Sequence, residues 1–143
     1  MSSQGFRLAA ALAIAGGALL FAPSDQASAQ TPCVANATTL CLNNSRFKVT
    51  VNWQVASQGT SGVGTGIPLT GDTGEFWFFS ANNIELVVKV VDGRAFNNHY
   101  WVFYGALSDV AYTITVTDST NGAVKTYSNP QGHLASSADI TAF

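Results

Sequence analysis

Three short runs in the middle of the chain constrain its fold more than any other feature. They are rich in aromatic and β-branched residues, and they cover residues 76–79 (FWFF), 85–91 (ELVVKVV) and 100–104 (YWVFY). Asn, Asp and Gly separate them, and this is the composition of adjacent β-strands joined by turns. Because successive residues on both faces of these runs are mostly apolar, we expect the strands to lie in the middle of a sheet that is covered on both sides.

The other expected strands follow from alternation and turn residues. Residues 47–55 place Phe, Val, Val, Trp and Val on one face and Lys, Thr, Asn and Gln on the other, which predicts a half-buried strand. A Gly/Ser-rich stretch predicts a mobile loop over residues 56–66, and the chain from Asn129 onward predicts a polar tail. Further strands are expected within 67–69, 99–107, 112–117 and 123–128. About seven strands predict an all-β, antiparallel, immunoglobulin-like β-sandwich, with a small closed barrel as the alternative.

The N-terminus has the pattern of a secretory signal peptide. Arg7 supplies a positive charge, residues 8–21 are almost wholly apolar, and residues 27–29 (ASA) fit a cleavage site. The apolar run is shorter than the ~20 residues of a membrane-spanning helix. The sequence predicts a signal peptide over residues 1–29 and a single domain over residues 30–143. The protein is expected to be secreted or periplasmic, without membrane attachment once the signal is removed.

Export would place Cys33 and Cys41 in an oxidising compartment. Their spacing is not the Cys-x-x-Cys of redox and metal sites, and no histidine is nearby in the sequence. We therefore expect a disulfide between Cys33 and Cys41 that fixes the N-terminal arm against the first strand.

Charge and motif content disfavour several classes of function. The chain carries a formal net charge of −2 and has no basic stripe, so nucleic-acid binding is not expected. Neither His99 nor His133 has a partner at zinc-ligand spacing, and no Gly-x-Ser-x-Gly elbow is present. Glu75 and Glu85 are not spaced as an evident glycosidase pair. A hydrolase remains an alternative, but the sequence assigns no catalytic residue and no cofactor.

The acidic loops offer a second alternative. Asp72, Asp92 and Asp118 could supply oxygen ligands for Ca²⁺, yet no Asp-x-Asp-x-Asp run is present. An Asp before Gly or Ser in a turn commonly bonds its own backbone instead. We therefore expect no metal site.

Aromatic side chains are the remaining signal for a binding surface. Along 76–79 and 100–104, successive rings point to opposite faces, so one set fills the core. The other set is expected to lie under the N-terminal arm or the Phe143 tail, or against a partner. In the second case Trp77, Tyr100 and Tyr104 would form an aromatic platform for a sugar, a peptide or a protein.

Several motifs give the chain a family resemblance. They are residues 40–49 (LCLNNSRFKV), 68–79 (PLTGDTGEFWFF), 83–92 (NIELVVKVVD), 98–103 (NHYWVF), 116–118 (VTD), 127–130 (YSNP) and 142–143 (AF). Together they resemble an uncharacterised domain that recurs in secreted bacterial proteins, alone or appended to larger extracellular proteins. The resemblance implies export and a compact all-β module, and it transfers no catalytic residues.

The sequence thus predicts a secreted, non-enzymatic binding module whose partner is an extracellular protein or a polysaccharide. One form of the protein-binding hypothesis is an extracellular peptidase inhibitor that inserts residues 56–66 or 92–98 into an active-site cleft. The alternative is a carbohydrate-binding module that uses the aromatic platform.

Overall fold

The structure is a computed structural model that describes residues 31–143, so the expected signal peptide lies outside the described residues. The described chain is built almost entirely from β-strands. They are β1 (Leu40–Leu42), β2 (Phe47–Val55), β3 (Thr60–Val63), β4 (Thr65–Pro68), β5 (Thr73–Trp77), β6 (Ile84–Asp92), β7 (Tyr100–Ala106), β8 (Ala111–Asp118), β9 (Val124–Asn129) and β10 (Ser136–Asp139). A 3₁₀ turn, η1 (Ala56–Gln58), and a short helix, α1 (Arg94–Asn97), complete the list.

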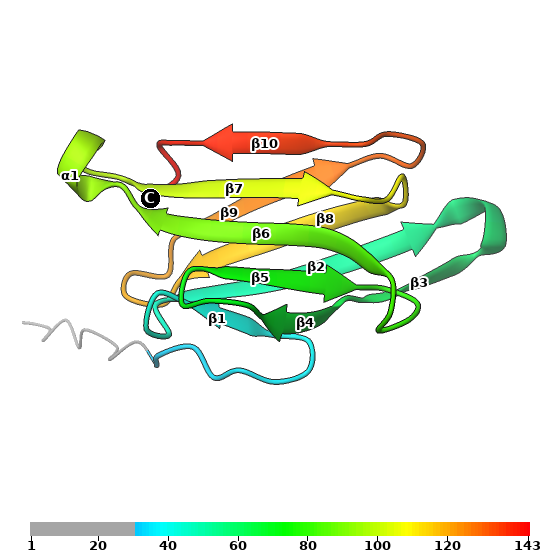
Figure 1. Cartoon of the computed structure of the whole chain (residues 1–143), viewed down its shortest axis with the longest axis horizontal. Helices are drawn as coiled ribbons and strands as arrows, with labels where there is room; N and C mark the ends of the chain where they lie inside the picture. Colours follow the sequence, from blue (N-terminus) through cyan, green and yellow to red (C-terminus); the bar gives the residue numbers. More distant parts are fainter. Residues whose placement is uncertain (1–30) are drawn as a thin grey trace, which may run out of the picture.

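Two antiparallel sheets pack face to face and confirm the predicted β-sandwich (Figure 1). The first sheet has the order β1-β2-β8-β9, and β3 also pairs with β2. β1 and β3 share one edge of β2 end to end, since β1 pairs with residues 47–49 and β3 with residues 52–55. The second sheet has the order β10-β7-β6-β5-β4. The sheets are separate layers, which rules out the closed barrel.

The core lies between the sheets and follows the predicted alternation. Its fully buried members come from both layers, and the largest are Phe47, Phe76, Leu42, Leu86 and Ile114. In the first sheet, residues of β2 and β8 alternate between this core and the outer face. Each of these strands therefore carries a structural face and a solvent face.

Two sequence predictions about irregular segments are wrong. Residues 56–66 do not form a mobile loop, because β2 turns through η1 into β3 and the chain then enters β4. The polar tail after Asn129 contains β10, which pairs with β7. β3 and β10 are short and polar and lie at sheet edges, where only one side of the strand is hydrogen-bonded and little apolar surface is buried. β1 was not predicted as a strand either, and it has only three residues.

The N-terminal arm is fixed as expected. The Cys33–Cys41 disulfide is confirmed, with the two Cα atoms 5.7 Å apart, and it ties the arm to β1. The carbonyl of Ala37 accepts a hydrogen bond of 2.9 Å from the backbone N–H of Gly66, so the arm also covers part of the free edge of β4. Pro68 in the same strand cannot donate to a further strand, which protects this edge as well.

The turn between β1 and β2 joins the two sheets. Asn43, Asn44 and Ser45 all have positive φ, between 52° and 64°, a conformation that Asn tolerates better than most residues. The Asn43 amide donates to the carbonyl of Val90 in β6 at 2.6 Å, and its backbone N–H donates to Gly71 at 2.7 Å. The turn is held in this strained conformation by bonds to the opposite sheet.

Candidate functional site

A groove of about 650 Å³ lies on the outer face of the first sheet. Four strands supply its lining in the spatial order β3, β2, β8 and β9. We call it the polar groove, and its residues are Asn52, Trp53, Gln54, Ser61, Gly62, Val63, Ala111, Tyr112, Thr113, Ser128, Asn129 and Pro130.

Strand register explains which of these residues reach the groove with their side chains. Gln54 lies opposite Ser61 on one side and Ala111 on the other, and Asn52 lies opposite Thr113. Val51 and Ile114, their neighbours along the strands, are fully buried in the core. Because side chains alternate along a strand, Asn52, Gln54 and Thr113 point away from the core into the groove.

The polar side chains of the groove are uncharged donors and acceptors, and Val63, Ala111 and Pro130 add apolar surface between them. Asn52 and Gln54 offer amides, and Thr113 and Ser128 offer hydroxyls 3.0 Å apart. Among the described residues, no Asp, Glu, Lys, Arg or His contributes to the lining. This surface can bind a ligand rich in neutral hydroxyl or amide groups, whereas a charged ligand would lose water without gaining a counter-charge.

Aromatic packing supports the sheet beneath the groove. Trp53 pairs with Tyr112 across β2 and β8, and its ring stacks on Phe78 of the other sheet with centroids 6.0 Å apart. Within the described part of the chain, Trp53 Nε1 and the Tyr112 hydroxyl are buried without a hydrogen-bond partner. Burial raises the pKa of Tyr112 to about 12. The Tyr112 hydroxyl therefore stays protonated near pH 7.

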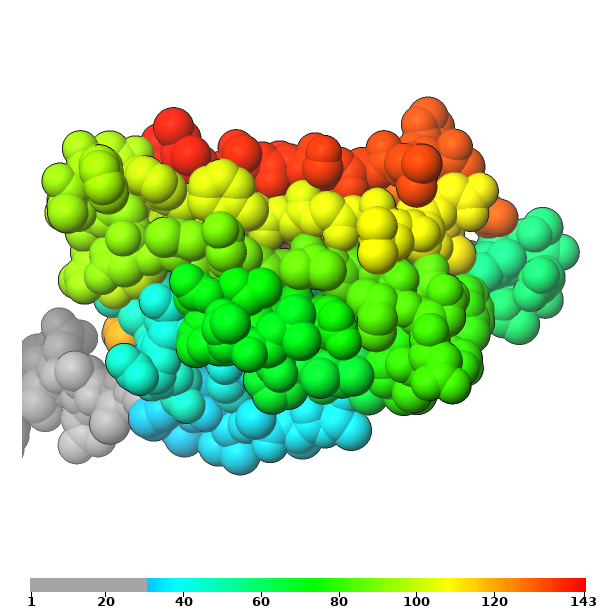
Figure 2. Space-filling model, viewed as in Figure 1, coloured from blue at the N-terminus to red at the C-terminus, as the bar shows by residue number. Residues whose placement is uncertain are grey.

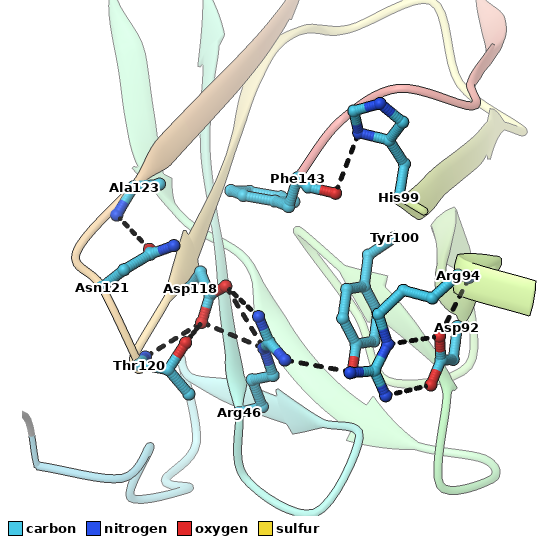
Figure 3. Close-up of polar contacts among 10 residues, drawn as sticks. All are labelled: Arg46, Asp92, Arg94, His99, Tyr100, Asp118, Thr120, Asn121, Ala123 and Phe143. Atoms are coloured by element: carbon cyan, nitrogen blue, oxygen red, sulfur yellow. Dashed lines mark hydrogen bonds and ion pairs between the residues drawn. The ribbon is translucent and has the colours of Figure 1, made fainter. Parts of the chain in front are cut away.

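An ionic cluster occupies the opposite end of β8 (Figure 3). The fully buried carboxylate of Asp118 accepts hydrogen bonds from Arg46, the shortest being 2.7 Å, and from both the hydroxyl and the backbone N–H of Thr120. Burial alone would raise the pKa of Asp118, but these bonds outweigh it and hold the pKa below its usual value. The Arg46 guanidinium also donates to the Tyr100 hydroxyl at 3.1 Å.

A second arginine packs on the same tyrosine. The Arg94 guanidinium lies 4.8 Å from the centre of the Tyr100 ring and pairs with Asp92 at 2.6 Å. This pairing lowers the pKa of Asp92 to about 2. A hollow of about 220 Å³ lies beside Arg46, between Pro32 and Ser119. Since both guanidiniums already have carboxylate partners, we interpret the ionic cluster as structural.

The predicted platform residues do not lie on one surface. Tyr100 is only 6% exposed and packs edge-on against Phe47 in the core, with ring centroids 4.8 Å apart. Tyr104 also faces inward and contacts Tyr127. Trp77 is partly buried and points the other way, because its neighbour Phe76 fills the core. The three rings therefore belong to opposite faces of the second sheet and cannot form one platform.

The outer face of the second sheet is lined by other aromatic residues. Figure 2 shows β10, β7, β6 and β5 side by side on this face without another segment across them. Trp101 and Phe103 lie on it, but their rings are inclined by 73°, and Trp101 is inclined by 42° to Phe96. Tilted rings shield one another and do not form a flat stacking surface. The expected cover is absent in the described residues: Phe143 instead packs on Phe47 in the core.

The histidines are far apart. His99 immediately precedes β7. His133 lies near the other end of that strand, because Ala135, two residues further along the chain, accepts a backbone hydrogen bond from Ala106, the last residue of β7. Seven residues of strand separate the two positions, or about 20 Å. Within the described range, the structure brings no catalytic pair together around either histidine, and no group of three or more His, Cys, Asp or Glu side chains could hold a metal ion.

The three loop aspartates considered for Ca²⁺ are already bonded. Asp92 and Asp118 pair with arginines, as described above. Asp72 accepts hydrogen bonds from the hydroxyls of Thr70 and Thr73 at 2.7 and 2.8 Å. These bonds lower the pKa of Asp72. Asp92 and Asp118, in contrast, also accept bonds from the backbone N–H groups of Arg94 and Thr120, and this is the side-chain-to-backbone turn role that the sequence predicted.

Comparisons with known proteins give no relative: no family model, no curated protein and no solved structure matches the chain. The resemblance to a recurrent domain of secreted bacterial proteins therefore stays a prediction. Among residues 31–143, no helix has the length and apolar character to span a membrane.

The polar groove was missed as a site, although its signal is present in the sequence. The alternation of residues 47–55 and 112–117 already assigns Asn52, Gln54 and Thr113 to the solvent face. What alternation does not provide is the pairing of β2 with β3 and β8, which brings these side chains into one concave surface.

Proposed function

We propose that this chain is an exported, non-enzymatic binding module that holds a neutral polysaccharide in the polar groove. The main support for this proposal is a groove of about 650 Å³ whose lining includes amides and hydroxyls. Among the described residues, no charged side chain lines it. Sugar hydroxyls both donate and accept hydrogen bonds, so they match amide and hydroxyl side chains, which do the same. The disulfide supports export, because such bonds persist in oxidising compartments.

This proposal moves the expected glycan site from the aromatic platform to the other sheet. Affinity would come from several hydrogen bonds and from contact with small apolar groups such as Val63 and Ala111. Rigid strands hold these groups, so little entropy is lost on binding.

Affinity electrophoresis tests the proposal. The folded chain should be retarded in native gels that contain soluble neutral polysaccharides, namely xylan, galactomannan and mixed-linkage β-glucan, and retardation in at least one gel is expected. Polygalacturonate, which is anionic, should not retard it. The double substitution Asn52→Ala and Gln54→Ala should abolish retardation, whereas Gln58→Ala, an exposed amide in η1 outside the groove, should leave it unchanged.

Two results would contradict the proposal. One is unchanged mobility of the wild-type chain in every neutral gel. The other is retardation that persists in the double variant while circular dichroism shows that the variant remains folded, because binding would then occur elsewhere.

Protein binding is a second candidate, supported by one observation. Phe96 projects from α1 with 81% of its surface exposed, and α1 lies at the opposite end of the sandwich from η1 (Figure 1). The two loops considered for insertion therefore cannot enter one cleft together, and the α1 loop is the candidate. A panel of serine, cysteine and metallopeptidases tests it: the wild-type chain should inhibit at least one, and Phe96→Ala should not. Absence of inhibition across the panel would count against the inhibitor form.

A further inference from the structure

The polar groove is longer across the strands than along them. It involves four hydrogen-bonded strands, and three spacings of about 4.8 Å give a length of about 14 Å. Along each strand, only about three consecutive residues contribute, which corresponds to roughly 7 Å. A ligand that fills the groove is therefore elongated and lies perpendicular to the strands.

One long side of the groove is bordered by a connected loop. Pro130 follows β9 and lines the groove, and the next side chain, Gln131, accepts a hydrogen bond of 3.2 Å from the backbone N–H of Ala56 in η1. The backbone N–H of Gly132 donates to the carbonyl of Asp109 at 2.7 Å, which ties the same loop to the β7–β8 connection. These bonds connect the loops at the ends of β2, β8 and β9 along the long side of the groove.

Both short ends of the groove coincide with sheet edges. Among the described strands, β3 pairs with β2 alone and β9 pairs with β8 alone. In β9, the exposed positions are Val124, Thr126 and Ser128. Hydrogen-bonded pairs alternate along an antiparallel ladder, and Asp118 bonds to Ala123, the residue before Val124. The backbone groups of the three exposed residues therefore point away from β8, toward the free edge. No strand of the described chain closes the groove at β3 or at β9.

From this open-ended shape we infer that the polar groove holds an internal segment of a linear, neutral polysaccharide, which enters over one sheet edge and leaves over the other. The inference rests on the proposed function and adds the mode of binding. A site for a chain end would need a barrier across one short side of the groove, whereas the connected loops described above border its long side.

The test is calorimetric titration of the folded chain with oligosaccharides of the neutral polymer that retards it most, from the monosaccharide to the hexasaccharide. Affinity should rise with length until the groove is filled and then level off. Borohydride reduction of the reducing end of the hexasaccharide, and capping of its non-reducing end with a methyl ether, should change affinity less than twofold.

Variants locate the segment. Thr113→Val and Gln54→Ala should each weaken hexasaccharide binding by about tenfold, as expected for one lost hydrogen bond. Thr115→Val is the matched control, because Thr115 lies on the same face of β8 two residues away and outside the groove lining. An equal loss for Thr113→Val and Thr115→Val would overturn the inference.

The remaining outcomes separate the inference from the proposed function. If the monosaccharide binds as tightly as the hexasaccharide, or if modifying either chain end abolishes binding, the internal-segment inference is wrong while glycan binding stands. If none of the neutral oligosaccharides or polymers binds, both are wrong.

Discussion

Arg46 and Asp118 connect β2 and β8 through a forked ion pair whose shortest N–O distance is 2.7 Å, at the end of the sandwich remote from the polar groove. Arg46 immediately precedes β2 and Asp118 is the last residue of β8, so the pair fixes where the two strands meet. The Asp118 side chain is fully buried, whereas Arg46 retains 27% exposure. Hydrogen bonds from Arg46 and Thr120 thus stabilise the charged form of the buried Asp118 carboxylate.

Asp118→Asn should destabilise the fold by about 2 kcal/mol, because it removes the charge at the fully buried end of the ion pair and weakens the hydrogen bonds from Arg46 and Thr120. Urea unfolding monitored by tryptophan fluorescence measures the change. Asp92→Asn is the matched control, since Asp92 also pairs with an arginine but is exposed, and its unfolding midpoint should not move. Equal midpoints for Asp118→Asn and the wild-type chain would contradict the structural role assigned to the pair.

Stability should fall in acid. Asp72, Asp118 and Asp139 all have pKa values below the usual one. For Asp139, burial works against the shift, and bonds from Tyr127 and Thr141 outweigh it. Because the unfolded carboxyls titrate near pH 3.9, the unfolded chain binds more protons below about pH 5, and the free energy of unfolding decreases as pH falls from there.

A urea series between about pH 7 and pH 2 measures this loss. Stability should be nearly constant above about pH 5, and Asp118→Asn should show a shallower decline in acid because one shifted carboxyl is missing. A decline of the same depth in wild type and variant would show that Asp118 does not contribute.

Two tyrosines that differ in hydrogen bonding should respond differently to loss of the hydroxyl. Tyr127 donates to Asp139 at 2.9 Å, whereas the buried Tyr112 hydroxyl lacks a partner among the described residues. Tyr127→Phe should therefore cost about 1 kcal/mol, and Tyr112→Phe should be neutral or stabilising by up to about 1 kcal/mol. Thermal unfolding of the two variants gives the comparison. A larger loss for Tyr112→Phe than for Tyr127→Phe would be incompatible with these contacts.

Two neighbouring aromatic residues test the assignment of faces in β5. Phe76 is fully buried in the core, and Trp77 is partly exposed on the outer face. Phe76→Ala should cost about 4 kcal/mol through cavity formation, and Trp77→Ala only about 1 kcal/mol. Chemical denaturation measures both values, and the reverse order would mean that the strand presents its faces the other way round.

Alternation along the chain was sufficient to predict the central strands and the composition of the core. Phe47, Val49 and Val51 are buried as the period of two requires, and Lys48 and Asn52 are exposed. The disulfide followed from the two cysteines and their expected compartment. These features depend on local sequence, which is why they could be read without coordinates.

The edge strands and the groove could not be read in the same way. β3 and β10 are short and contain mainly Thr, Ser, Gly and Ala, so they carry little hydrophobic signal. The aromatic platform failed because Trp77 and Tyr100 point to opposite faces of the sheet. The polar groove depends on register between distant residues, such as Gln54 with Ala111, and register is set by long-range pairing.

The strands that form the groove also form the core, with the two roles assigned to alternate residues. Asn52 and Gln54 can be replaced without touching Val51 or Val55, which face the other side. A combinatorial library at the groove positions of β2, β3, β8 and β9 would thus vary ligand preference on a constant scaffold. Natural variants of such a module could diversify in specificity by the same route, while the pattern of buried residues that encodes the sandwich stays unchanged.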